Sequence, residues 1–165
     1  MSQGHLKLTP DLVSALPLVP AELKAIDSMS TEALAVFCFS DVRPLAGAAE
    51  MLDWRMGGRL SRALERGLIN GTRGESALLP CEARRRRRIF VFGLGEVRAA
   101  DQALFRAVSR EAMDALQRAG ASGAVFVAAA TRQDVEVEAT FLRAIAEELG
   151  GQVRTVLVSP AHEHA

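Results

Sequence analysis

Five consecutive arginines, Arg84, Arg85, Arg86, Arg87 and Arg88, are the side chains best suited to bind a charged partner. Clustered guanidinium groups bind phosphates, nucleic acid or acidic proteins. A charge run is also typical of a solvated connection, here one whose last arginines enter the next strand. No aromatic residue interleaves with the arginines, which argues against stacking on single-stranded nucleic acid. Both interpretations stay open, and the solvated connection is favoured.

Glycines and one aspartate mark a second candidate site. Gly93 and Gly95 follow an apolar run and precede a helical pattern, a context in which backbone N–H groups can face a phosphate. The third glycine of a dinucleotide fingerprint is missing, so a structural turn is the favoured interpretation. Together with Asp41, Gly57 and Gly58, these residues are the candidates for a small-molecule crevice at the carboxyl ends of the strands.

Nucleophilic, acid–base and metal chemistry find little support in the sequence. The three histidines, His5, His162 and His164, all lie near the termini, where rigid positioning is not expected. The pair in the C-terminal tail has no further metal ligands nearby, and we expect that tail to be disordered. We therefore predict no catalytic residue, no metal site and no cofactor.

Trp54 is the one tryptophan of the chain and lies within a helical pattern. Tryptophan is enriched among the residues that dominate protein interfaces, so Trp54 is a candidate contact with a partner. A tryptophan partly covered by its own domain is the alternative, and it is slightly favoured. If Trp54 does lie in an interface, the partner is a second copy of the chain or another protein.

Composition limits the class of protein. A chain of 165 residues with 49% hydrophobic residues is expected to form one domain with a continuous core. The 20 basic and 20 acidic residues give zero net charge, which argues against nucleic-acid or membrane binding driven by overall charge. The two cysteines form no CxxC pair, and the N-terminus lacks the apolar stretch of a signal peptide. We expect a cytoplasmic protein without a membrane partner.

The elements that must position these residues alternate along the chain. Apolar runs predict strands over residues 32–40, 75–81, 87–93, 124–130 and 153–158. Helical spacing predicts helices over residues 45–66, 101–119 and 134–149. Residues 1–30 should add one or two irregular strands over 6–20 and a short helix over 21–26. We expect residues 31–158 to form the core and residues 159–165 to form a polar tail. This order predicts a single α/β domain, a three-layer α/β/α sandwich around a mixed sheet of about five to seven strands.

The predicted helix over 45–66 contains Gly57 and Gly58 in its interior. Each glycine costs about 1 kcal/mol relative to alanine in that position. We therefore expect a close approach of another backbone to this part of the helix.

Three stretches, in this order, resemble the N-terminal domain of the leucine (cytosol) aminopeptidase family. They are residues 33–40 followed by Leu52-Asp53 and Gly58 to Leu64, then Gly71 through Gly74-Glu75 to Leu78-Leu79-Pro80, and then the segment IFVFGLG from Ile89 to Gly95. Asp101 matches the start of the helix that follows in the family. The resemblance extends over about residues 32–130.

The resemblance implies a macro-domain-like fold that packs beside a peptidase domain and helps to build hexamers; some family members also bind DNA. The family's peptidase domain holds two metal ions around an N-T-D-A-E-G-R motif, which this sequence does not contain. The resemblance therefore assigns aminopeptidase chemistry to none of these residues. It leaves open whether the chain stands alone or is a fragment of a longer peptidase, although Met1 and a complete last strand favour the former.

Macro domains that bind ADP-ribose carry asparagines in the strand before their long helix. The corresponding segment here, residues 32–39, has Phe37 and apolar neighbours instead, and only Gly57-Gly58 loosely resembles the glycine-rich loop. The leading interpretation is a non-catalytic interaction or oligomerisation module. A nucleotide or ADP-ribose-like ligand in the crevice and DNA on the arginine run are the alternatives.

Overall fold

A six-stranded sheet forms the centre of the computed structural model, which describes residues 16–79, 87–121 and 123–160. In chain order the strands are β1 (Leu18–Pro20), β2 (Ala33–Phe39), β3 (Ser76–Leu79), β4 (Arg88–Gly95), β5 (Val125–Val127) and β6 (Val156–Val158). Their order in the sheet is β1-β6-β5-β2-β4-β3. Neighbouring strands run parallel except β3 and β4, which are antiparallel, so the sheet is mixed as predicted.

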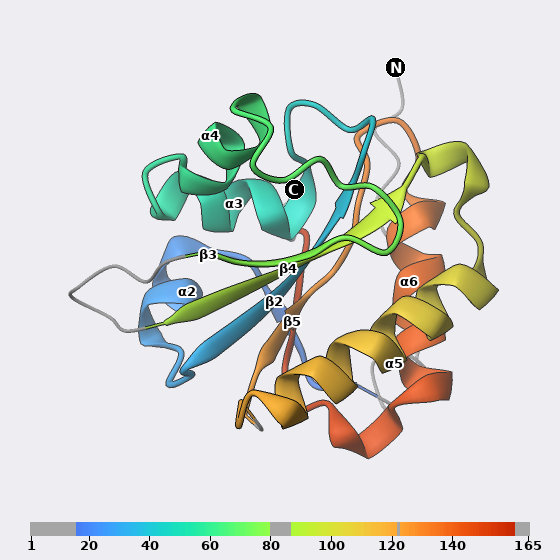
Figure 1. The fold of residues 1–165 in the computed structure, drawn as a ribbon. Helices are drawn as coiled ribbons and strands as arrows, with labels where there is room; N and C mark the ends of the chain where they lie inside the picture. Colours follow the sequence, from blue (N-terminus) through green and yellow to red (C-terminus); the bar gives the residue numbers. More distant parts are fainter. Residues whose placement is uncertain (1–15, 80–86, 122, 161–165) are drawn as a thin grey trace, which may run out of the picture.

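Helices cover both faces of the sheet (Figure 1). On one face lie α2 (Leu23–Ser28), α3 (Gly47–Arg55) and α4 (Arg59–Glu65), and on the other α5 (Gln102–Arg118) and α6 (Glu136–Glu148). Two short 3-10 helices, η1 (Val97–Ala99) and η2 (Gly150–Gln152), complete the elements of the described residues. The predicted three-layer α/β/α sandwich is confirmed.

The central strand β2 is buried along its whole length and supplies both cores. Because side chains alternate along a strand, Phe37 and Phe39 pack towards α5 and α6, whereas Val36 and Cys38 pack towards α3 and α4. Phe37 contacts three other phenylalanine rings at centroid distances between 5.0 and 5.7 Å. The continuous apolar run in the sequence therefore reflects a strand covered on both sides.

The prediction of one helix over residues 45–66 is wrong. The helix ends at Arg55, and α4 begins at Arg59. Gly57 and Gly58 between them have φ angles of 70° and 78°, in the left-handed region that glycine reaches without a steric penalty. The two glycines form the turn between two helices, so no other backbone needs to approach them.

The other boundaries differ by a few residues. The last strands are shorter than predicted, because β5 ends at Val127 and β6 begins only at Val156, after η2. Of the predicted strands over 6–20, only β1 lies within the described residues. Asp101 caps α5 as expected, since its carboxylate accepts the Leu104 N–H at 2.7 Å. None of the helices in the described parts of the chain has the length and apolar character needed to cross a membrane.

Candidate functional site

The carboxyl end of β4 is covered by a loop of the chain itself. A Cβ atom on Gly93 would lie 1.9 Å from the Thr72 carbonyl oxygen, so only glycine fits beneath this loop. The Glu75 carboxylate holds the loop in place, because it accepts the backbone N–H groups of Asn70 at 2.9 Å, Gly71 at 2.7 Å and Thr72 at 3.2 Å. The G-x-x-G-E segment is thus a self-contained turn that closes over the strand.

Gly95 and Asp41 lie next to this loop and also form hydrogen bonds within the chain. The Gly95 N–H donates to the Gly71 carbonyl at 2.8 Å, and the Gly95 carbonyl accepts the Ser40 N–H at 2.9 Å. The Asp41 carboxylate accepts the Val97 N–H at the start of η1, at 3.1 Å. The structure brings Asp41, Gly93 and Gly95 together, but the backbone groups that could have faced a phosphate bind the chain's own loop.

An ion pair ties the covering loop to α5. Arg73 donates two hydrogen bonds to the Glu111 carboxylate, at 2.9 and 3.0 Å. The guanidinium group lowers the pKa of the Glu111 carboxyl below its ordinary value. Both side chains remain substantially exposed, so we expect a contribution to stability of at most about 1 kcal/mol.

The neighbouring part of the strand ends is closed by Ser159. A Cβ on Gly47, at the start of α3, would lie 2.6 Å from the Ser159 Oγ and 2.8 Å from the Ala130 Cβ. Glu138 of α6 accepts the Ser159 N–H at 2.7 Å and its hydroxyl at 2.6 Å. Burial raises the pKa of the Glu138 carboxyl, and the bonds from Ser159 oppose this effect.

Glu138 is not among the candidate residues predicted from the sequence. It is only 4% exposed, which is unusual for a glutamate. Its position gave a signal, because Glu138 stands four residues before Leu142 and seven before Ile145, on the apolar stripe of the helix. A carboxylate on that stripe is expected to meet a buried hydrogen-bond donor.

Gly57 and Gly58 do not join the other crevice candidates. They lie near the amino-terminal ends of the strands, because adjacent residues of α3 and α4 pack against Leu34 and Ile89, which stand near the starts of β2 and β4. The turn that they form is fixed by Asp53, which is 6% exposed. The five candidates therefore form no single site.

The Asp53 carboxylate caps the amino terminus of α4. It accepts the N–H groups of Leu60 at 2.8 Å and Ser61 at 3.2 Å, and the Ser61 hydroxyl at 2.5 Å. A side chain at the end of one helix thus satisfies the free donors of the next. This contact gives the Leu52-Asp53 and Gly58-Arg59-Leu60-Ser61 segments their structural role.

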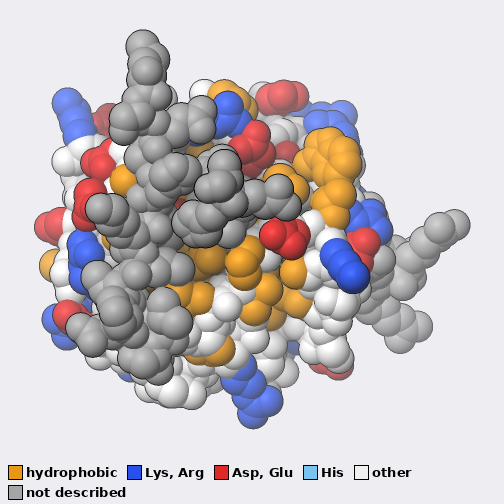
Figure 2. Space-filling view, turned by 180° about the vertical axis from the view of Figure 1, so that it is seen from behind, with side chains coloured by type: hydrophobic (Ala, Val, Ile, Leu, Met, Phe, Trp, Pro, Cys, Tyr) orange, Lys and Arg blue, Asp and Glu red, His pale blue; other side chains and the backbone are white. Residues whose placement is uncertain are grey.

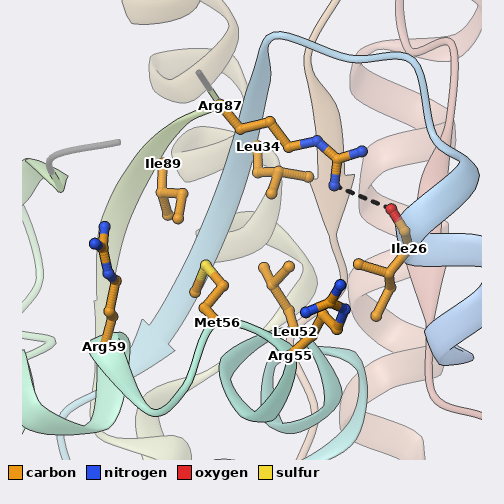
Figure 3. Close-up of a pocket in the computed structure, with 8 residues that line it drawn as sticks. All are labelled: Ile26, Leu34, Leu52, Arg55, Met56, Arg59, Arg87 and Ile89. Atoms are coloured by element: carbon orange, nitrogen blue, oxygen red, sulfur yellow. Dashed lines mark hydrogen bonds between the residues drawn. The ribbon is translucent and has the colours of Figure 1, made fainter. Parts of the chain in front are cut away.

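A small cavity lies beside this turn (Figure 3). Its lining combines an apolar floor with an arginine rim and consists of Ile26, Leu34, Leu52, Arg55, Met56, Arg59, Arg87 and Ile89. Its volume is about 60 Å³. Ligand pockets usually measure about 300–1,000 Å³, so this cavity has room for a few waters rather than a nucleotide. Arg55 is bound to Asp27 at 2.6 Å at its edge.

The last two arginines of the run have contacts within the domain. Arg87 donates to the carbonyls of Ile26, at 3.0 Å, and Met29 at the carboxyl end of α2. Arg88 donates to the carbonyl of Ala119 at the end of α5, at 3.0 Å. Because consecutive residues point to opposite faces of the sheet, each arginine caps a helix on a different side.

Several other predicted positions lie outside the described residues. They are Arg84, Arg85, Arg86, Cys81, His5, His162 and His164, together with most of the predicted tail.

Trp54 is exposed on α3, with 66% of its surface accessible. Two leucines share this exposure, Leu68 at 69% and Leu78 at 54%. Trp54 is thus only partly covered by the described parts of its own domain, and about two thirds of its side chain is accessible to a partner. Figure 2, which shows the molecule from behind the view of Figure 1, has hydrophobic side chains gathered near the middle of that face.

The described residues hold no group of three or more His, Cys, Asp or Glu side chains that could bind a metal ion. Cys38 is buried in the core, and this burial raises the pKa of its thiol to about 12. A thiol with such a pKa is protonated at neutral pH and is a poor nucleophile.

Comparison with known proteins places these features in a family context. Residues 35–151 match the profile described as "Cytosol aminopeptidase family, N-terminal domain". No curated protein matches the sequence. Among solved structures, a mutant of tomato leucine aminopeptidase is similar with a TM-score of 0.61 at 16% identity, covering 92% of this chain and 33% of the tomato chain.

Macrodomains are similar in fold as well. The macrodomain of Thermus aquaticus DarG aligns with a TM-score of 0.53 at 15% identity, covering 88% of this chain and 98% of its own. The macrodomain of Mycobacterium tuberculosis DarG gives a TM-score of 0.53 at 17% identity, covering 88% and 99%. The chain thus has a macro-like fold and spans about a third of the length of the tomato enzyme.

Proposed function

The chain belongs to the cytosol aminopeptidase family through its N-terminal domain, and on this premise we propose that it is a non-catalytic interaction module of the cytoplasm. It acts by docking on a second copy of itself or on another protein. The observation that carries the proposal is the exposure of Trp54, because a large aromatic side chain left open on a helix is typical of an interface residue.

The covering of the strands' carboxyl ends by the chain's own segments supports a non-catalytic role. Macro-like and other α/β sheets bind ligands beyond the carboxyl ends of their strands. Here the Glu75-held loop covers β4, and Ser159 lies against Gly47 at the start of α3. The polar groups at these ends are used to hold the chain's own segments, which leaves the outer surface as the part of the domain that meets partners.

Trp54 also provides the assay, because the chain has one tryptophan and no tyrosine. Its emission therefore reports the environment of a single side chain. We expect a shift to shorter wavelength, with quenching by iodide reduced, as the protein is concentrated or mixed with a candidate partner. Sedimentation velocity on the same samples gives the mass of the species that forms.

Trp54→Ala should weaken the interaction, and Leu68→Ala, which truncates a comparably exposed apolar side chain, is the matched control. A protein that stays monomeric near millimolar concentration, captures no partner from cell extract and keeps a fully exposed tryptophan would refute the proposal.

Binding of a nucleotide or an ADP-ribose-like molecule is the second candidate, favoured by the likeness of the fold to two macrodomains. Such a ligand would have to displace the loop between Asn70 and Glu75. Calorimetry with ADP-ribose, ADP and inorganic phosphate is the test, and absence of heat at millimolar ligand removes this candidate.

DNA binding through the arginine run is the third candidate. Arg87 and Arg88 already donate to backbone carbonyls of the domain, so the contribution would have to come from Arg84, Arg85 and Arg86. It predicts affinity that falls steeply with salt, because phosphate contacts release counterions. Affinity that is absent, or that does not change with salt, excludes it.

A further inference from the structure

The outer edge of β3 has backbone groups without partners in the described residues. β3 is the last strand of the sheet and pairs only with β4. Gly93 donates its N–H to the Glu75 carbonyl at 2.8 Å, and these two residues stand opposite each other. Because antiparallel pairing alternates, Ala77 and Leu79 also face β4, whereas the N–H and C=O groups of Ser76 and Leu78 point outward.

The side chains of this short edge strand lack the features that usually prevent strands from pairing. Natural edge strands carry lysines, prolines, inward charges or bulges. The segment Ser76-Ala77-Leu78-Leu79 contains none of these, and its register with β4 is regular. The adjacent carboxylate of Glu75 is turned into its own loop, where it accepts three backbone N–H groups. Leu78 is 54% exposed at the middle of the edge.

We propose that a second copy of the chain pairs antiparallel along β3, with the two-fold axis at Ala77. Ser76 of one copy then faces Leu78 of the other, and the outward donors and acceptors of both residues are satisfied by the same groups of the second copy. The two sheets become one continuous sheet. This inference rests on the proposed interaction function and adds to the surface at Trp54 a second surface, the β3 edge, whose partner is another copy of the chain.

The edge is complementary to itself, which favours a second copy over an unrelated strand. Two outward donors and two outward acceptors on each copy match under a two-fold rotation, the symmetry of an isologous dimer. The strand has four residues, so the pairing is limited to this short segment. A net charge of zero means that two copies approach without overall repulsion.

The side chains on the α5 side of the sheet add an apolar contact. Leu78 lies opposite Phe90 in the β3–β4 register, and the Arg88 guanidinium lies 5.6 Å from the centre of the Phe90 ring. In the dimer Leu78 packs beside Ser76 of the second copy and diagonally towards its Leu78. Because the paired strands are short, we expect weak, concentration-dependent association rather than an obligate dimer.

Sedimentation velocity from micromolar to near-millimolar protein tests this arrangement. Leu78→Lys places like charges close together across the axis and should weaken dimerisation by roughly tenfold or more. Ser76→Pro removes an N–H that the domain does not use in its own ladder, so the fold should persist while pairing is lost. Leu68→Lys changes a leucine outside the edge that is even more exposed than Leu78, and it should leave dimerisation unchanged.

Hydrogen exchange on the unmodified protein gives a second readout that needs no variant. The amides of Ser76 and Leu78 should exchange more slowly as the concentration rises, while those of exposed loops stay unchanged. A dimer that persists in both edge variants, or whose edge amides gain no protection, overturns the proposed edge but leaves the interaction function standing. A monomer at every concentration overturns self-pairing. If that monomer also binds no other protein, the proposed function fails with it.

Discussion

Replacing Gly93 by alanine tests whether this glycine serves the packing of a loop or the binding of a phosphate. The new Cβ would lie 1.9 Å from the Thr72 carbonyl oxygen and 2.8 Å from the carbonyl carbons of Gly71 and Thr72. These are backbone atoms, so no flexible side chain can move aside. To reach an ordinary contact of 3.4 Å, the loop must move by about 1.5 Å.

Such a movement disrupts the hydrogen bonds that hold the loop. The bonds from Gly93 N–H to the Glu75 carbonyl and from Gly95 N–H to the Gly71 carbonyl are both 2.8 Å long. Losing two or three bonds at about 1 kcal/mol each, together with residual overpacking, gives a destabilisation of about 2–4 kcal/mol. For a domain of this size that corresponds to a decrease in Tm of roughly 6–12 °C.

Urea and thermal unfolding followed by circular dichroism measure this loss. Gly151→Ala is the matched control, because a Cβ there would meet nothing within 4 Å, and it should change stability by no more than about 0.5 kcal/mol. If Gly93→Ala unfolds at the same temperature as the unmodified protein, the packing argument for this glycine fails. Reduced binding of inorganic phosphate at unchanged stability would instead support the phosphate site.

Three further predictions concern side chains of the core and the helix ends. Asp53→Ala removes the cap of α4 and should lower the free energy of unfolding in urea by about 1–3 kcal/mol. The control Glu50→Ala breaks only the exposed ion pair with Arg132 and should lower it by less than about 1 kcal/mol, so equal losses would contradict the capping role. Burial raises the pKa of Glu138, so the folded state binds its proton more tightly and stability falls as pH rises above the ordinary glutamate value of about 4.3. Glu138→Gln should reduce this decline of stability with pH, as measured by unfolding curves from mildly acidic to neutral pH. An unchanged dependence of stability on pH would argue against a raised pKa at Glu138. In a Cys81→Ser background, Cys38 should react with a thiol reagent only at the rate of unfolding, because burial raises its pKa to about 12. Rapid labelling of the folded protein would contradict the burial of this thiol.

The alternation of elements could be predicted because it depends on local patterns. The run from Ala33 to Phe39 is buried on both faces, and the stripes of α5 and α6 face the sheet. The break of the predicted helix at Gly57 was misread, because side-chain spacing continues through a two-residue turn almost unchanged. Only the positive φ angles, and the cap that Asp53 provides, reveal where one helix stops and the next begins.

The candidate site was harder to predict, because it depended on which residues meet. A glycine at positions 57, 58, 93 and 95 is compatible with a turn, a bound phosphate or a closely packed backbone. The sequence alone could not distinguish between these roles. The structure separates the first pair from the second and places the Thr72 carbonyl oxygen directly against Gly93. Arg87 and Arg88 are neighbours in the arginine run, but they donate hydrogen bonds to the ends of two different helices.

The fold class, the buried strands and the family could all be inferred from the amino-acid sequence, because periodicity and the order of short motifs are properties of the chain. Three features follow from the three-dimensional contacts instead: the domain's own loops close the strand ends, Glu138 is buried against Ser159, and the described residues leave Trp54 and the edge of β3 exposed. These outcomes depend on contacts between residues far apart in the chain, and local propensity carries no information about such contacts.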